Sequence, residues 1–300
     1  MTTNNGLLLV DKPSGLTSHD VVARIRKVMN ERRVGHAGTL DPMATGLLVI
    51  AVGPSTRLLR FAQSEVKRYR GTVKLGIATD SLDADGEVVE ERSVPAVSND
   101  AMQSLANEML GPQRQTPPMV SAIKVGGRRL HELARQGIEV EREPRDITVS
   151  DFKVNSTVDP SVWEFDVECT VGTYVRVLLG DLAQKAGTVG HLTSLRRISS
   201  GRHHVDDAIP LDDLEALVVA GGSPFQAPLA FVEALEHATL DEDQERRMRM
   251  GQQIEIDATF QSAEIVAINQ HGSFAAILRR RGEKWKPEVV LPVESHEPQG

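Results

Sequence analysis

A single aspartate lies between a glycine-containing segment and an apolar run, in the sequence RRVGHAGTLDPMATGLLVIAVG at residues 32–53. The run Leu47–Val52 contains only apolar residues, which is typical of a strand buried on both faces. Two glycines precede the acid, and glycine allows a backbone to turn sharply or to approach a ligand closely. Pro42 follows Asp41 and restricts its backbone. The pattern predicts a loop that holds the Asp41 carboxylate and leads into a buried strand.

Two interpretations fit this local pattern, an ordinary Asp-Pro turn before a strand and a loop that presents a catalytic acid. The longer motif favours the second, because G-H-x-G-x-L-D-P-x-A-T-G-L-L is matched at every fixed position from Gly35 to Leu48. It resembles the catalytic motif of the TruB-type tRNA pseudouridine synthases. The resemblance implies that Asp41 is the essential catalyst, either as a covalent nucleophile or as a base in a glycal-type path.

Two distant residues extend this resemblance. Tyr69 alternates with basic residues in KRYRGTVKLG and is expected on the inner face of a half-buried strand. Arg176 falls where a strand pattern changes to helical spacing, and a cation in a first helical turn is unfavourable to the helix dipole. In the family, the corresponding Lys-Arg-Tyr places its ring against the target base, and the arginine of GTYIR, here GTYVR, pairs with the catalytic aspartate.

The resemblance also assigns residues around the target base. HLTSLRR resembles the family segment that closes the pocket with Leu195. A base inside a folded loop must be flipped out of its stack before chemistry. His36 is expected to occupy or stack in the vacated space, and a loop histidine without this role is the alternative.

The formal net charge is −8, which argues against a general affinity for nucleic acid. Phosphate binding depends on local basic surface, however. Residues 113–146 combine prolines, a Gly-Gly pair and basic side chains, and resemble the TruB-specific thumb insertion that clamps the RNA stem-loop. The candidate RNA contacts are Lys67, Arg68, Lys124, Arg128, Arg129 and Arg135, and the acid-free stretch 190–204 adds Arg196, Arg197 and Arg202.

The apolar spacing predicts both strands and helices. Alternation predicts strands at 67–76 and 162–171, and helical spacing predicts a helix with Ser18 as its N-cap and another at 99–110. The resemblance implies an α+β pseudouridine synthase fold with a central mixed, mainly antiparallel sheet flanked by helices. Its catalytic domain would cover residues 1–230. A small C-terminal PUA-like β-barrel would cover 235–295, with a charged helix at 241–250 and short strands at 254–256, 264–269, 274–278 and 289–291.

Several classes of site are not indicated. The single cysteine, Cys169, cannot form an internal disulfide or a multi-cysteine metal site. No HExxH or P-loop spacing is present, so neither a metal nor a cofactor is expected. No stretch approaches the roughly 18 apolar residues of a membrane span. We expect a cytoplasmic monomer with no membrane association and no indicated protein partner.

The implied activity is the isomerisation of uridine 55 in the T-loop of tRNA to pseudouridine, by base flipping, aspartate-dependent glycosidic cleavage and re-attachment through C5. Three alternatives remain open. Ribosomal RNA enzymes typically carry H-R-L-D around the acid, and the guide-RNA-dependent type shares much of the motif but usually lacks the thumb. A non-catalytic RNA-binding or tRNA-folding module would need the basic surface without Asp41, and such a role could coexist with catalysis.

Overall fold

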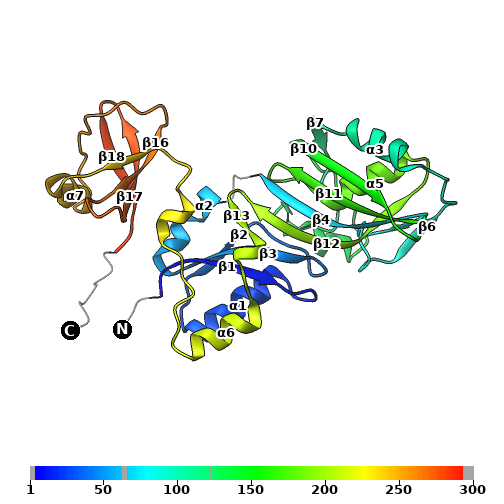
Figure 1. Ribbon diagram of the computed structural model, residues 1–300, viewed down its shortest axis with the longest axis horizontal. Helices are drawn as coiled ribbons and strands as arrows, with labels where there is room; N and C mark the ends of the chain where they lie inside the picture. The colour runs from blue at the N-terminus through cyan, green and yellow to red at the C-terminus, as the bar shows by residue number, and fades with distance from the viewer. Residues whose placement is uncertain (1–3, 63–65, 122, 293–300) are drawn as a thin grey trace.

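The computed structural model describes residues 4–62, 66–121 and 123–292 (Figure 1). Within these ranges, one ten-stranded sheet forms the main body, with the path β14-β1-β3-β12-β4-β11-β10-β7; β2 also pairs with β3, and β13 with β12. Its strands are β1 (Gly6–Lys12), β2 (Val34–Ala37), β3 (Thr45–Val52), β4 (Lys67–Leu75), β7 (Gly111–Gln115), β10 (Arg145–Ser156), β11 (Val162–Cys169), β12 (Gly190–Ser200), β13 (His203–His204) and β14 (Ile209–Pro210). Only the β1–β14 and β3–β12 pairs of this sheet are parallel among the described strands, so the predicted mixed, mainly antiparallel sheet is confirmed.

Strand β12 joins the two halves of this sheet, because it pairs with β3 on one side and with β4 on the other (Figure 1). The apolar run predicted after the acid is β3, which is buried from Gly46 to Val52. Gly46 permits the close approach of β12. A Cβ on this glycine would lie 2.3 Å from the carbonyl oxygen of Arg197, and its φ of +97° also favours glycine.

Helices cover the sheet in two groups. The helices α1 (Ser18–Met29) and α6 (Leu211–Val219) share an apolar cluster with β1 and β3. The helices α3 (Asn99–Asn107) and α5 (Val175–Lys185) share another with β4, β10 and β11. Further short helices of the main body are η1 (Gly53–Leu58), α2 (Leu59–Ala62), η2 (Val205–Asp207) and η3 (Pro228–Phe231).

Two predicted helix details are wrong. Thr17, and not Ser18, is the N-cap of α1, because its side chain accepts a hydrogen bond from the Asp20 amide while the Asp20 carboxylate accepts one from the Thr17 amide. The Ser18 hydroxyl instead bonds the backbone of Leu40. Helix α3 ends at Asn107 rather than residue 110, which leaves Leu110 43% exposed.

Two segments extend from this body between its strands. The acidic stretch after β4 is a hairpin of β5 (Ile77–Thr79) and β6 (Val88–Glu91). The expected thumb holds β8 (Lys124–Val125), β9 (Arg128–Arg129) and α4 (Leu130–Ala134). Residues 113–115 and 145–146 belong to β7 and β10 of the central sheet, so the inserted part lies between residues 116 and 144.

The C-terminal part is a four-stranded sheet with the order β15-β16-β17-β18. Its elements are β15 (His237–Thr239), α7 (Glu242–Arg249), β16 (Glu264–Ile268), β17 (Phe274–Arg281) and β18 (Lys284–Val290). The strand predicted at 254–256 is only an isolated bridge between Ile254 and Trp285. Among the described residues the pairing runs from β15 to β18 without closing, so a barrel is not established. Residues 1–3 and 293–295 of the two predicted domains lie outside the described residues.

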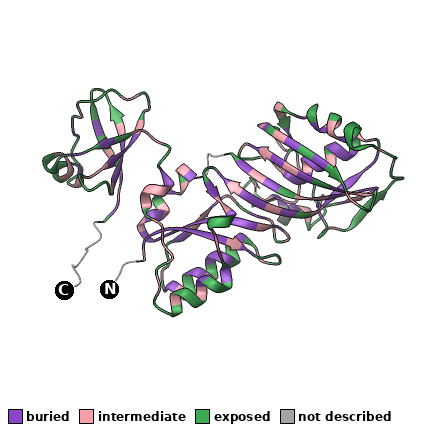
Figure 2. Cartoon of the chain, viewed as in Figure 1, coloured by how far each residue is buried: buried purple, intermediate pink, exposed green. Residues whose placement is uncertain are grey.

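The C-terminal sheet docks on the main body through an apolar layer. Buried Ile277 and Val289 belong to the same cluster as Leu58 and Ala62, and Figure 2 shows buried residues in both parts. An ion pair of 2.9 Å between Arg60 and Glu264 lies beside this layer.

Candidate active site

The structure brings five predicted site residues to one cavity. Asp41, Tyr69, Arg176 and Leu195 line a cavity of about 380 Å³, together with Lys67, another predicted residue, and Arg197. This volume falls within the usual range of small-ligand pockets, roughly 300–1,000 Å³. The lining residues come from the loop before β3, from β4 and β12, from the inserted segment at Ser121 and Ile123, and from the turn before α5 and the start of that helix.

The loop that carries Asp41 is held by side chains from β1 and α1. The Lys12 ammonium, on a residue without solvent exposure, donates to the carbonyl of Pro42 at 3.3 Å. The Ser18 hydroxyl accepts from the Leu40 amide at 2.8 Å. These contacts fix the residues on either side of the acid, so the carboxylate is held as the sequence pattern predicts.

Arg176 holds the carboxylate from the opposite side of the cavity. Its Nε atom lies 3.0 Å from Oδ2 of Asp41, and its Nη1 atom lies 3.2 Å from Oδ2 of Asp83. The same guanidinium donates to the carbonyls of Ser81 at 2.6 Å and Val120 at 2.9 Å. Its side chain is only 3% exposed. These four acceptors account for an arginine in the first turn of α5.

The charge state of Asp41 depends on this environment. Burial raises the pKa of the Asp41 carboxyl above its ordinary value, the Arg176 cation opposes that rise, and the Asp83 carboxylate adds to it. A desolvated carboxylate is stabilised in its ionised form by a nearby cation and by charge-assisted hydrogen bonds. Arg176 therefore both orients Asp41 and favours its ionised form.

Tyr69 extends from β4 into the same cavity and is 8% exposed. It is paired in register with Val167 of β11 and Arg197 of β12, so both neighbouring strands fix its position. Burial raises the pKa of its phenol, while the nearby Arg197 guanidinium opposes that rise. The phenol is therefore neutral at pH 7.

The other predicted contacts do not line this cavity. His36 lies on β2, where its ring contacts His19 edge to face at a centroid distance of 5.5 Å. Arg68 forms ion pairs with Asp166 at 2.6 Å and Asp151 at 3.2 Å. The thumb residues Lys124, Arg128 and Arg129 form the small β8–β9 hairpin, and Arg135 follows α4.

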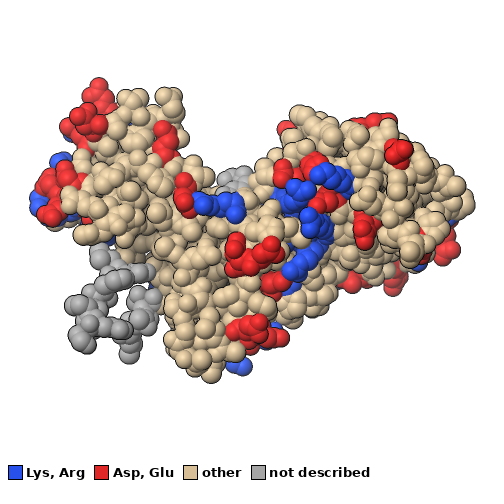
Figure 3. Space-filling view, in the orientation of Figure 1, with Lys and Arg blue, Asp and Glu red and all other residues tan. Residues whose placement is uncertain are grey.

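The basic stretch 190–204 does not form the surface that its charges predict. Arg196 pairs with Asp11 at 2.7 Å, Arg202 pairs with Glu233, and Arg197 is fully buried. Acidic side chains from other elements therefore neutralise much of this cluster. On the face drawn in Figure 3, basic side chains form a band across the main body, and acidic side chains lie beside this band.

Sequence reasoning missed the roles of Asp83 and Arg197. Asp83 lies in the turn between β5 and β6, and its contact with Arg176 joins that turn to the site. A signal for Arg197 was present, because it lies two residues after Leu195 in a strand, and such residues share one face.

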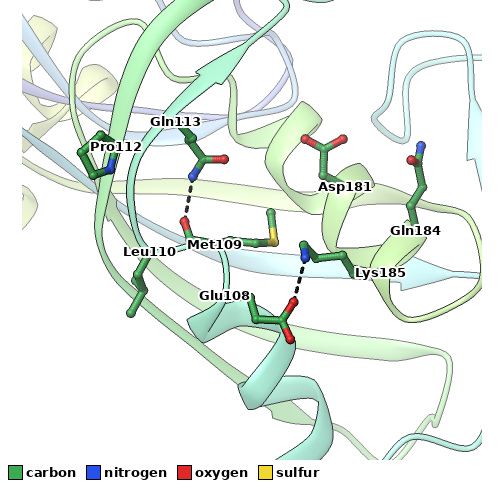
Figure 4. Close-up of a pocket in the computed structure, with 8 residues that line it drawn as sticks. All are labelled: Glu108, Met109, Leu110, Pro112, Gln113, Asp181, Gln184 and Lys185. Atoms are coloured by element: carbon green, nitrogen blue, oxygen red, sulfur yellow. Dashed lines mark hydrogen bonds and ion pairs between the residues drawn. The ribbon is translucent and has the colours of Figure 1, made fainter.

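A second cavity, of about 520 Å³, lies between the ends of α3 and α5 and is drawn in Figure 4. Glu108 and Lys185 form an ion pair of 2.8 Å there, and Gln113 donates to the Met109 carbonyl at 2.7 Å. Burial raises the pKa of Asp181, another lining residue. This cavity contains none of the predicted site residues and does not combine a fixed acid with an arginine, so the smaller cavity is the candidate active site.

Within the described ranges, no group of three or more His, Cys, Asp or Glu side chains is arranged to hold a metal ion. Cys169 is buried in the core, and burial raises the pKa of its thiol to about 11. In the same part of the chain, no helix is both long enough and apolar enough to cross a membrane.

Comparison with known proteins identifies the family. The family model described as TruB family pseudouridylate synthase (N terminal domain) matches residues 26–175. The chain belongs to the TruB family of pseudouridylate synthases. The predicted family and isomerase class are thereby confirmed.

Similar TruB-family proteins come from several bacteria. The tRNA pseudouridine synthase B of Opitutus terrae is 49% identical over 213 residues, which cover 71% of this chain and 88% of that protein. The protein of the same name from Streptococcus pneumoniae is 39% identical over 293 residues, which cover 96% of this chain and 99% of that protein.

The fold is also similar to a chain in a crystal structure of a Cbf5-Nop10-Gar1 complex. The TM-score is 0.74 at 23% identity, and the match covers 97% of this chain and 87% of that chain. At this identity the likeness concerns the fold alone.

Proposed function

We propose that this protein is a tRNA pseudouridine synthase that isomerises uridine 55 in the T-loop of tRNA. The observation that carries the proposal is the ion pair between Asp41 and Arg176 in the cavity that also contains Tyr69. The relatives named tRNA pseudouridine synthase B, one of which covers 96% of this chain, support tRNA as the substrate.

The reaction breaks the bond between ribose C1′ and uracil N1 and forms a bond between C1′ and C5. The C5 position loses a proton and N1 gains one, so the isomerisation is redox-neutral and requires no electron carrier. We assign Asp41 to glycosidic cleavage, either as the nucleophile that attacks C1′ or as the base of a glycal-type path. Arg176 holds the carboxylate in position for either path.

Tyr69 and Leu195 would enclose the flipped uracil. The target base must leave its stack, which costs about a few kcal/mol, and the buried Tyr69 ring offers a face for stacking in return. We assign stacking to Tyr69 first and removal of the C5 proton second, because burial raises the pKa of its phenol and disfavours the phenolate.

The remaining predicted contacts are proposed to bind RNA. Lys67 lines the cavity and would bind close to the flipped nucleotide. His36 and Arg68, with the thumb residues Lys124, Arg128 and Arg129, would bind RNA outside the cavity. We assign catalysis to a domain of residues 1–230, in which the thumb within 113–146 would clamp the stem-loop. Residues 235–295 would form a PUA-like C-terminal domain. We propose that the protein acts in the cytoplasm as a monomer without a cofactor or a protein partner.

Tritium release tests the function directly. A tRNA transcript labelled with tritium at uridine C5 releases the label to water when C5 becomes bonded to ribose. We expect release by the wild type and a rate at least about 1,000-fold lower for Asp41→Asn. The matched control is Asp100→Asn, at an exposed acid in the first turn of α3, which should retain the wild-type rate. Equal release by wild type and Asp41→Asn would overturn the assignment of Asp41, and mapping pseudouridine in the product identifies the modified position.

A tRNA-folding role is a second candidate, because the basic thumb residues do not line the cavity that contains Asp41. Asp41→Asn protein should then still accelerate the refolding of misfolded tRNA. A loss of this acceleration together with tritium release would limit the protein to catalysis.

A further inference from the structure

Arg197 is a fully buried arginine between the two strands that carry the site. It lies on β12, in register with Gly46 of β3 on one side and with Tyr69 of β4 on the other. Its exposed fraction is 0%, yet it lines the cavity that contains Asp41. Its side chain therefore lines the cavity from within the sheet and is not exposed on the outer surface of the protein.

The guanidinium makes directed contacts with both sides of the site. Its Nε atom donates to the Leu47 carbonyl at 2.6 Å, Nη2 to the Gly38 carbonyl at 3.1 Å and Nη1 to the Thr39 carbonyl at 3.4 Å. Two of these acceptors lie in the loop that leads to Asp41. On the other side, Tyr69 is the cross-strand partner of Arg197 and lines the same cavity, and the nearby guanidinium opposes the rise in the pKa of its phenol.

Two features of the backbone, one on β12 and one on β3, allow Arg197 to occupy this position. The pairing of β12 with β4 shifts register between Arg197 and Ser199, which marks an irregularity of the β-bulge kind. Such bulges re-aim side chains and are frequent beside active sites. On the other strand, Gly46 has no Cβ to contact the Arg197 backbone, so β3 and β12 can approach closely.

Packing alone does not explain this residue. Within the described part of the chain, no carboxylate forms an ion pair with Arg197, and its guanidinium donates to three backbone carbonyls. Transfer of a charge from water to a protein interior costs several kcal/mol, which an apolar side chain of similar size avoids. An apolar side chain could neither donate to the Asp41 loop nor place a positive charge beside Tyr69.

We propose that Arg197 is a positioning residue of the reaction, whose guanidinium fixes the Asp41 loop and the Tyr69 phenol relative to each other. The inference rests on the proposed function, because it assigns Arg197 to the geometry of that reaction. It also reassigns Arg197 from the phosphate contact that the basic stretch predicts. Since Arg197 reaches RNA only through the cavity, its loss should lower the rate of the chemical step and leave tRNA affinity nearly unchanged.

The test compares Arg197→Met, which removes the charge and the donors, with Arg197→Lys, which keeps the charge and one donor group. Single-turnover tritium release gives the rate, and filter binding gives tRNA affinity. We expect Arg197→Met to lower the rate about 100-fold, the size of effect produced by small misplacements of catalytic groups. Arg197→Lys should recover about a tenth of the wild-type rate. Both should keep tRNA affinity within about 3-fold of wild type.

The matched control is Arg24→Met, which removes an arginine paired with Asp212 and Glu215 between α1 and α6.

A spectroscopic measurement separates positioning from general stability. The chain contains two tyrosines, so ¹³C labelling of the tyrosine Cζ atoms gives two signals that Tyr174→Phe assigns. In Arg197→Met the Tyr69 signal should shift and the Tyr174 signal should not. Arg24→Met should leave both unchanged.

The possible outcomes are distinct. Loss of tRNA affinity in proportion to rate would return Arg197 to RNA binding, and an unchanged rate or an unchanged Tyr69 signal would also overturn the proposal. Failure of both Arg197 variants to fold would assign the residue to stability and overturn it as well. If wild-type protein releases no tritium, the proposed function fails, whereas the inference about Arg197 fails only against an active wild type.

Discussion

The Nε atom of Arg176 lies 3.0 Å from Oδ2 of Asp41, and the same guanidinium lies 3.2 Å from Asp83. One buried cation thus lies between two acids, of which Asp41 keeps a side-chain exposure of 34% and Asp83 one of 7%. Two carboxylates near each other resist joint ionisation unless a cation compensates them. The arginine is therefore required for the charge of Asp41 as well as for its orientation.

Arg176→Lys should separate catalysis from binding. Lysine keeps the charge but cannot supply the planar set of donors that reaches Asp41, Asp83 and two carbonyls together. We expect the single-turnover rate to fall about 100-fold and tRNA affinity to stay within about 3-fold. Tritium release and filter binding measure the two effects. Arg24→Lys is the control, and a parallel loss of affinity and rate would identify Arg176 as an RNA contact instead.

His36 should make stability depend on pH. Burial lowers the pKa of His36 to about 4, from an ordinary value of 6.5. Between these values the unfolded chain binds more protons than the folded chain, so the free energy of unfolding rises with pH across this window. The stabilisation is complete above pH 6.5 and is lost as pH falls towards 4.

Urea unfolding of wild type and His36→Gln at pH 7 and pH 4.5 measures this effect. The drop in unfolding free energy at the lower pH should be smaller in the variant, by about 1–3 kcal/mol. His271→Gln, in the exposed turn between β16 and β17, should behave like wild type. Identical drops in wild type and His36→Gln would contradict the prediction.

Gly46→Ala should be more destabilising than an alanine at another glycine with positive φ. Gly46 and Gly187 have φ values of +97° and +85°, so alanine is strained at both. A Cβ at Gly46 would meet the Arg197 carbonyl oxygen at 2.3 Å, whereas a Cβ at Gly187 would meet nothing within 4 Å. We expect the free energy of unfolding to fall by about 3 kcal/mol or more in Gly46→Ala and by about 1 kcal/mol in Gly187→Ala. Equal losses in urea unfolding would show that β3 and β12 can separate at little cost.

Ile277→Ala should report on the docking of the C-terminal sheet. Ile277 and Ile265 are both fully buried, but Ile277 belongs to the cluster shared with Leu58, and Ile265 belongs to the cluster within the C-terminal part. Both substitutions should lower the free energy of unfolding of the C-terminal part by about 2–4 kcal/mol. Only Ile277→Ala should also increase protease cleavage between the two parts, around residues 221–227. Equal cleavage in the two variants would mean that the shared cluster does not hold the sheet in place.

The sequence was informative where neighbouring residues determine the environment. The alternation in β4 predicts that Tyr69 faces inward, and the unfavourable position of Arg176 in its helix predicts a partner elsewhere. The family motif predicts that partner, Asp41, and the structure places the two in contact. The apolar run after the acid likewise predicts the buried strand β3.

The parts that were missed depend on which strands become neighbours. Arg68, Arg196 and Arg202 are basic in the sequence, but acids on other elements pair with each of them. Nothing near Arg197 in the sequence reveals that β12 lies between β3 and β4, because strand order is set by packing between distant segments. Closure of a C-terminal barrel likewise depends on pairing between distant strands, which the local pattern of residues does not determine.

The position of β12 has a consequence for synthesis of the protein. A nascent chain that has been translated only to residue 189 contains Asp41, Tyr69 and Arg176 but lacks the strand that lies between β3 and β4. Pairings between distant segments form only after the later segment is available. Activity should therefore appear only once residue 200 has left the ribosome, so translation sets the earliest moment at which the enzyme can modify RNA.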